Sequence, residues 1–146
     1  MTLSLHRLLM VSLVVGSGVL VACGGGGGSG TEADRIGIAA QCSKNSDCPE
    51  VAREDGGTYD LVCLTQFKGG YCGLEDCEAS VDCPTGSICV KHTDNKNYCF
   101  RVCKDKIECN ANRTADLEAN CSSNFDWAMA SDDDGSKACI PPSGSL

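Results

Sequence analysis

Thirteen cysteines in a chain of 146 residues restrict the possible fold more than any other feature. Twelve of them fall into three consecutive sets of four, and each set opens with two cysteines separated by five residues. The openings read CSKNSDC, CEASVDC and CKDKIEC, so an acidic residue (Asp47, Asp82 or Glu108) always precedes the second cysteine. Internal repetition of this kind predicts tandem copies of one small unit. The sets are Cys42, Cys48, Cys63 and Cys72; Cys77, Cys83, Cys89 and Cys99; and Cys103, Cys109, Cys121 and Cys139.

The rest of the composition favours disulfides as the main source of stability. After Cys23, Leu, Ile, Val and Phe make up only 18 of 124 residues, which is too few for a charged chain to form a core unaided. Cysteine at roughly a tenth of an exported chain indicates a disulfide scaffold instead. The predicted fold class is therefore small and disulfide-rich, with three tandem four-cysteine modules, short β-hairpins and little helix.

The second half of each set predicts a β-hairpin. In the first set, an apolar run around Cys63 is followed by the turn sequence KGG at residues 68–70 and then by Tyr71-Cys72. In the second set, residues 87–102 contain two apolar runs with a turn around Asp94-Asn95 between them. In the third set, alternating apolar residues at 125, 127 and 129 precede SDDDGSKACI, which predicts a strand, an acidic turn and a second strand.

Four cysteines allow three pairings within each module. We favour the pairing of the first with the third and of the second with the fourth, because this crossed arrangement constrains both the opening loop and the hairpin. The third module also contains a predicted insertion, a helix of one or two turns after Thr114, since Thr114 can cap it and Asp116 lies near its positive end. The predicted modules are residues 42–76, 77–102 and 103–146.

The amino terminus predicts export. Residues 1–22 begin with a short segment ending in Arg7 and continue with fourteen mostly apolar residues, 8–21. This stretch is shorter than the ~20 residues that span a bilayer, and a basic start followed by a short apolar region is typical of a secretory signal peptide.

Leu20-Val21-Ala22-Cys23 resembles the lipobox of bacterial lipoproteins. The resemblance implies that Cys23 becomes the first residue after cleavage and carries a diacylglycerol with acyl chains such as palmitate, which would hold the protein on a membrane. Twelve cysteines, an even number, then remain for six disulfides. The alternative is an ordinary signal peptide cleaved elsewhere, with Cys23 in a disulfide. Residues 23–41 are predicted to be a lipidated, Gly-rich flexible tether with a reach of roughly 25 Å.

The cysteine spacing also resembles an extracellular family. From Cys77 to Cys109 the pattern C-x5-C-x5-C-x9-C-x3-C-x5-C is similar to the Dickkopf amino-terminal cysteine-rich domain. The resemblance implies an extracellular binding domain without catalysis. The chain lacks the adjacent cysteine pair of that family and has longer gaps in its first and third modules, so no partner is carried over.

Charge and residue types exclude several functions. The net charge of −8 becomes −9 once Arg7 leaves with the signal, which argues against nucleic acid as a partner. His92 is the one histidine after the signal, and it is expected to be a solvated turn residue without a catalytic role. The spacing C-x2-C does not occur, so no zinc site is expected. We expect neither a cofactor nor enzymatic activity.

These observations predict a lipid-anchored, disulfide-stapled protein of the cell envelope that acts as a non-catalytic binding or structural module. Its partners would be the membrane, through Cys23, and a protein or glycan ligand. Gly24 stands where an aspartate would retain many lipoproteins in the inner membrane, so we expect the outer membrane of a Gram-negative bacterium. The alternative is a cysteine-rich protease inhibitor or toxin-like effector that presents residues 50–59 or 92–97.

Overall fold

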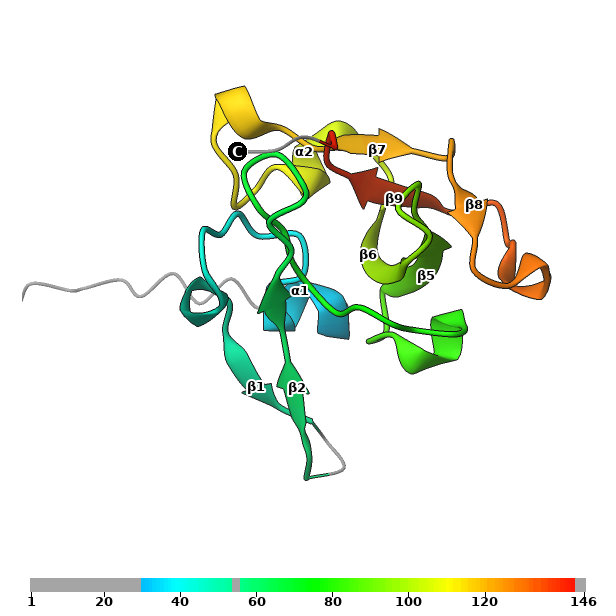
Figure 1. The fold of residues 1–146 in the computed structure, drawn as a ribbon, viewed down its shortest axis with the longest axis horizontal. Helices are drawn as coiled ribbons and strands as arrows, with labels where there is room; N and C mark the ends of the chain where they lie inside the picture. Colours follow the sequence, from blue (N-terminus) through cyan, green and yellow to red (C-terminus); the bar gives the residue numbers. More distant parts are fainter. Residues whose placement is uncertain (1–29, 54–55, 144–146) are drawn as a thin grey trace, which may run out of the picture.

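The computed structural model describes residues 30–53 and 56–143 (Figure 1). The predicted signal peptide, Cys23 and residues 24–29 lie outside the described residues. The strands are β1 (Glu50–Ala52), β2 (Thr58–Asp60), β3 (Val62–Cys63), β4 (Cys72–Gly73), β5 (Ser87–Lys91), β6 (Asn97–Cys103), β7 (Asn120–Ser122), β8 (Asp126–Trp127) and β9 (Lys137–Ile140). The described α-helices are α1 (Glu32–Ile36) and α2 (Lys106–Cys109). Short strands and little helix confirm the predicted fold class.

Six disulfides join the twelve cysteines in the predicted crossed pairing, which is confirmed in all three modules. The pairs are Cys42–Cys63, Cys48–Cys72, Cys77–Cys89, Cys83–Cys99, Cys103–Cys121 and Cys109–Cys139. In every module the third and fourth cysteines lie directly opposite each other in a hairpin. Their sulfurs therefore leave the same face of the hairpin and reach the two cysteines of the opening loop.

The repeated acidic residue organises each opening loop. Its carboxylate accepts hydrogen bonds from backbone N–H groups at the start of the loop, which a short turn would otherwise leave unpaired. The contacts are Ser43 and Lys44 to Asp47 (2.8 and 3.2 Å), Glu78 and Ala79 to Asp82 (2.9 and 3.0 Å), and Lys104 to Glu108 (2.7 Å). The acidic residue that recurs in the sequence therefore has the same role in each module: its carboxylate caps backbone N–H groups of the opening loop.

The third hairpin differs from its prediction. β9 pairs with β7 and not with the segment around residues 125–129, and β8 pairs with β5 instead. The pairing of β7 with β9 places Cys121 opposite Cys139, as in the other two modules, so residues 123–136 are an insertion within the hairpin. The predicted helix after Thr114 is only a 3₁₀ turn, Ala115–Leu117, without a side-chain cap from Thr114.

The prediction of a flexible tether is wrong for residues 30–41, because these residues belong to the folded body. α1 begins with a capping box between Thr31 and Asp34. Ala33 and Ile36 are fully buried, and the Ala33 N–H donates to the carbonyl of Thr85 in the second module. Burial of two apolar side chains together with these hydrogen bonds outweighs the flexibility expected from the preceding glycines.

A salt bridge ties α1 to the five-stranded sheet. Arg101 on β6 donates from Nε to the carboxylate of Asp34. Partial burial alone would raise the pKa of Asp34, but the hydrogen bonds from Arg101 and Thr31 hold that pKa below its usual value. The segment before the first cysteine is therefore fixed to the second module by charge as well as by packing.

The three modules share one core. Opposed residues in the five-stranded sheet alternate between two faces, so that Ile88, Val90, Tyr98 and Phe100 lie on one face and the strand cysteines on the other. Phe67 and Tyr71 of the first module pack on the apolar face, with ring centroids 5.4 and 5.1 Å from that of Phe100. The modules therefore repeat the same cysteine spacing and disulfide pairing, and a common aromatic centre stabilises them.

Candidate functional site

The five-stranded sheet is strongly curved. Its strand order is β7-β9-β6-β5-β8, so β7 and β8 form opposite edges, yet only residues 123–125 connect them. Three connecting residues span at most about 14 Å, whereas the edges of a flat five-stranded sheet lie about 19 Å apart. The sheet therefore curls until its edges approach each other, and β8 lies beside the end of β7 in Figure 1.

The concave face of this sheet contains a cavity of about 720 Å³. It is larger than three other hollows of the described residues, which measure about 280 to 500 Å³. The apolar residues that line it come from several strands and from the segment between β7 and β8: Val90 and Phe100 are buried, whereas Phe125 and Ile140 are partly exposed. A cavity of this size that combines apolar and polar lining residues is a candidate ligand site.

Polar side chains line the walls of the cavity. Asn120 and Ser122 belong to the concave face of β7, while Asn95 and Asn124 come from the neighbouring turns. The side-chain amides of Asn95, Asn120 and Asn124 make no hydrogen bond with the described part of the protein. All three residues are exposed, so their amide donors and acceptors face water that a ligand can displace.

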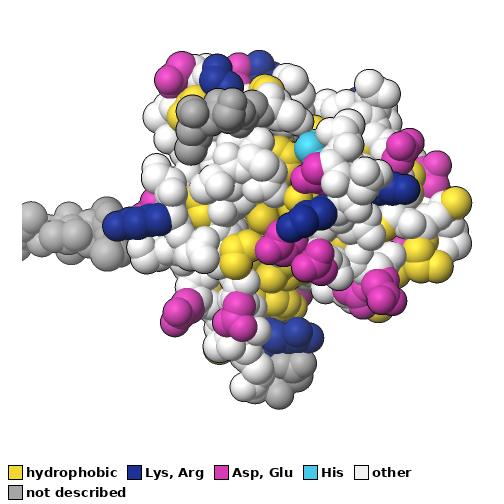
Figure 2. Space-filling view, viewed as in Figure 1, with side chains coloured by type: hydrophobic (Ala, Val, Ile, Leu, Met, Phe, Trp, Pro, Cys, Tyr) yellow, Lys and Arg dark blue, Asp and Glu magenta, His cyan; other side chains and the backbone are white. Residues whose placement is uncertain are grey.

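One end of the cavity holds His92, which is more enclosed than the solvated residue that we expected. Its side chain is only 12% exposed and packs edge-on against Phe67, with ring centroids 4.9 Å apart. Figure 2 shows correspondingly little of the one described histidine (cyan) at the surface. The expectation fails because Phe67, from the first module, covers the turn that joins β5 and β6.

Ser143 and Asp94 flank the imidazole of His92 on its two nitrogen atoms. His92 Nε2 lies 3.0 Å from Ser143 Oγ, and both residues line the cavity. His92 Nδ1 is buried, makes no well-aligned hydrogen bond in the described residues, and lies 3.3 Å from Asp94 Oδ1. Sequence reasoning missed Ser143 because 51 residues separate it from His92 and no local motif marks it.

Asp94 is itself held in place by its neighbours. Its carboxylate accepts hydrogen bonds from the Tyr98 hydroxyl (2.7 Å) and from the Lys96 N–H (3.0 Å). The slight burial of Asp94 would raise its pKa, but these hydrogen bonds and the nearby His92 keep that pKa below its usual value. Burial and the hydrogen bond to Asp94 raise the pKa of Tyr98 well above its usual value. At neutral pH the carboxylate is ionised and the phenol is protonated.

The twelve cysteines play no part in this cavity, because the strand cysteines lie on the opposite face of the sheet. In each module three sulfurs lie within 4.8 Å of one another, which resembles a metal-binding cluster in distance alone. Every one of these sulfurs is in a disulfide and so lacks the thiolate that zinc requires. The cysteines therefore build the scaffold on which the cavity stands.

Comparisons of the chain with known protein families, with curated proteins and with solved structures found no match. Within residues 30–53 and 56–143, no helix combines the length and apolar character needed to cross a bilayer. An assignment of function therefore depends on the amino-terminal sequence and on the cavity.

Proposed function

We propose that this protein is a disulfide-stapled bacterial lipoprotein, anchored in the outer membrane through lipid on Cys23, and that its body binds a protein or glycan ligand in the concave cavity. The resemblances to the lipobox and to Dickkopf-type cysteine modules are part of this proposal. The observation that carries it is the set of exposed asparagine amides that line the cavity together with Phe125 and Ile140.

The state of the other cysteines supports a lipid on Cys23. All twelve cysteines of the three modules are paired within the described structure, so no intramolecular partner is left for the thirteenth. A cysteine directly behind an apolar export signal can be acylated, form an intermolecular disulfide, stay a free thiol or be removed with the signal. The sequence LVAC favours acylation.

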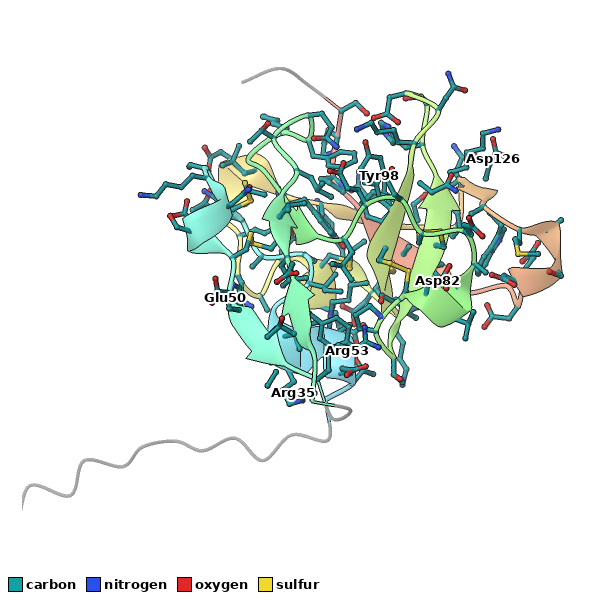
Figure 3. The ribbon with its side chains drawn as sticks, turned by 60° about the horizontal axis from the view of Figure 1, so that its bottom comes forward. Arg35, Glu50, Arg53, Asp82, Tyr98 and Asp126 are labelled. Carbon is teal, nitrogen blue, oxygen red and sulfur yellow. A yellow bond between two sulfur atoms is a disulfide. The ribbon has the colours of Figure 1, made fainter. Side chains whose placement is uncertain are left out.

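The position of α1 limits how far the body stands from the anchor. Only residues 24–29 separate Cys23 from the described body, and a Gly-rich segment of this length reaches roughly 15 Å. In Figure 3, Arg35 of α1 lies at the end of the molecule opposite Tyr98 and Asp126, which adjoin the cavity. With α1 toward the membrane, an anchored body would present the cavity away from the membrane surface.

The anchor is tested by Cys23→Ser. We expect the wild-type protein to sediment with outer membranes and the variant to appear in the soluble exported fraction, because the acyl chains supply nearly all of the membrane affinity. Intact mass will report a diacylglycerol on the wild-type chain only. Gly24→Asp is the matched control, since it leaves acylation intact and is expected to move the protein to the inner membrane. A Cys23→Ser protein that still sediments with membranes would contradict the proposal.

The cavity is tested with Asn120→Ala and Asn124→Ala, combined in the exported protein. We expect this double variant to lose at least tenfold in affinity for whichever glycan or envelope protein binds the wild type on a glycan array or in cross-linking. Each removed amide takes away hydrogen bonds worth about 1 kcal/mol. Asn112→Ala is the control, because its amide is also unpartnered but lies outside the cavity. Equal binding by both variants would place the ligand elsewhere.

The inhibitor alternative is favoured by one observation, the ribbon of β1 and β2. This ribbon projects from the body in Figure 1, as a protease-binding loop does. Its Arg53 guanidinium stacks over the ring of Tyr59 at 4.9 Å. A protease panel separates the two functions, because nanomolar inhibition by the exported protein would establish the alternative.

A further inference from the structure

Three side chains that ligand binding does not use meet at one end of the cavity. Ser143 Oγ lies 3.0 Å from His92 Nε2, and the Asp94 carboxylate lies 3.3 Å from His92 Nδ1. A hydroxyl, an imidazole and a carboxylate in this order are the parts of a serine nucleophile with its base and the group that orients the base. We propose that Ser143, His92 and Asp94 form a hydrolytic site that cleaves carboxylic esters bound in the cavity, an activity that the sequence analysis did not predict.

Phe67 fixes the two reacting partners relative to each other. Its backbone forms a β-bridge with Ser143, and the adjacent Lys68 N–H donates to the carbonyl of Pro142 at 2.9 Å. Its ring contacts the imidazole of His92. Phe67 is fully buried and adjoins the disulfide-bonded hairpin of the first module, so it is a rigid support. A nucleophile and base held by one rigid residue need little reorganisation during reaction.

Asp94 acts as a positioning residue. Hydrogen bonds from Tyr98 and Lys96 hold its carboxylate beside the buried Nδ1 atom. This placement favours the tautomer that carries the proton on Nδ1 and leaves Nε2 as the acceptor that faces Ser143. The 3.3 Å contact is not well aligned in the free protein, and catalytic hydrogen bonds often tighten only when substrate is bound.

The cavity walls define the class of substrate. The partly exposed side chains of Phe125 and Ile140 suit a short acyl group, and the exposed amides of the asparagines that line the cavity suit hydroxyl and carbonyl oxygens. An amide N–H directed at the reacting carbonyl oxygen would stabilise the oxyanion. The substrate is therefore a short-chain acyl ester of a hydroxylated compound.

The reaction balances with water as its only co-reactant. Ser143 Oγ bonds to the ester carbonyl carbon while its proton passes to His92 Nε2, and that proton leaves with the alcohol as the ester C–O bond breaks. Water then attacks the acyl-serine and passes a proton to Nε2. Collapse of this second intermediate breaks the bond to Ser143 Oγ, which recovers the proton, and releases the carboxylic acid.

The test uses the exported, disulfide-bonded protein with two probes, a fluorophosphonate and p-nitrophenyl butyrate. We expect the fluorophosphonate to label Ser143, as located by peptide mass, and the ester to be hydrolysed. Ser143→Ala should abolish labelling and lower ester hydrolysis at least 100-fold. Ser46→Ala is the matched control, because Ser46 is exposed and lies outside the cavity, and it should change neither.

His92→Gln and Asp94→Asn separate chemistry from structure. We expect His92→Gln to slow labelling of Ser143 about 100-fold, and Asp94→Asn to slow it about tenfold, with part of the loss restored in Asp94→Glu. The melting temperatures of all variants are measured alongside, so that a loss of labelling without a loss of fold is recognised. Absence of labelling in the wild type, labelling at another residue, or labelling that His92→Gln leaves unchanged would overturn the proposal.

Discussion

Reduction of the disulfides will unfold the body of this protein completely at 25 °C. The six bridges close loops whose ends lie 12 to 30 residues apart, and each contributes about 3 kcal/mol by restricting the unfolded chain. Together they exceed the roughly 5–15 kcal/mol by which an ordinary domain is stable. The aromatic core that remains is small, and it is assembled from segments that the bridges hold in place.

The measurement is circular dichroism, in the near and far ultraviolet, of protein reduced and then alkylated with iodoacetamide. Protein treated with iodoacetamide alone is the control, and it should keep its spectrum because all described cysteines are already paired. A reduced, alkylated chain that retains the near-ultraviolet signal of its buried aromatic side chains would show that packing alone suffices for this fold.

Gly70→Ala will lower the free energy of unfolding by about 3 kcal/mol or more and the melting temperature by roughly 10 °C. Gly70 has φ +65°, a conformation that an alanine adopts only with strain. A Cβ atom here would also lie 2.0 Å from the Cys42 carbonyl oxygen and 2.8 Å from its sulfur. Cys42 is bonded to Cys63, so it has little freedom to move away.

Gly135→Ala is the matched control for this prediction. Gly135 has a similar φ of +78°, but a Cβ atom at this position would meet no heavy atom within 4 Å. Its substitution should therefore cost only the conformational strain, about 1 kcal/mol. Thermal unfolding of the two variants measures the difference directly. Equal losses would mean that backbone strain, and not the close approach to Cys42, makes Gly70 necessary.

Local sequence signals predicted the repeated parts of the fold correctly. The spacing of the cysteines and the turn residues KGG and Asp94-Asn95 predicted the first two hairpins, because a hairpin depends mainly on residues close in sequence. The crossed disulfides follow from this geometry only in part, because two strand cysteines that bond outside the hairpin can still pair with the opening loop in two ways. The role of the acidic residue in each opening loop was not predicted, although its recurrence marked it.

The pairing of strands that lie far apart in the sequence could not be predicted from local sequence signals. The alternation at residues 125–129 correctly indicated a strand but could not show which edge it would join. β9 pairs with β7, where Cys121 lies opposite Cys139, and β8 pairs with β5. The segment before Cys42 had the composition of a tether, and only the apolar surface of the assembled modules makes its burial favourable.

The candidate site was likewise predictable only in part. The cysteine spacing predicted a disulfide scaffold of three like modules and set Cys23 apart from the other twelve cysteines, whereas His92 was expected to be a solvated turn residue. The folded chain alone shows that the sheet curls around a cavity, that asparagine amides line it, and that Ser143 lies beside His92. Cysteine spacing and turn chemistry act over a few residues, whereas the cavity depends on strand edges and a terminal segment brought together from distant parts of the chain.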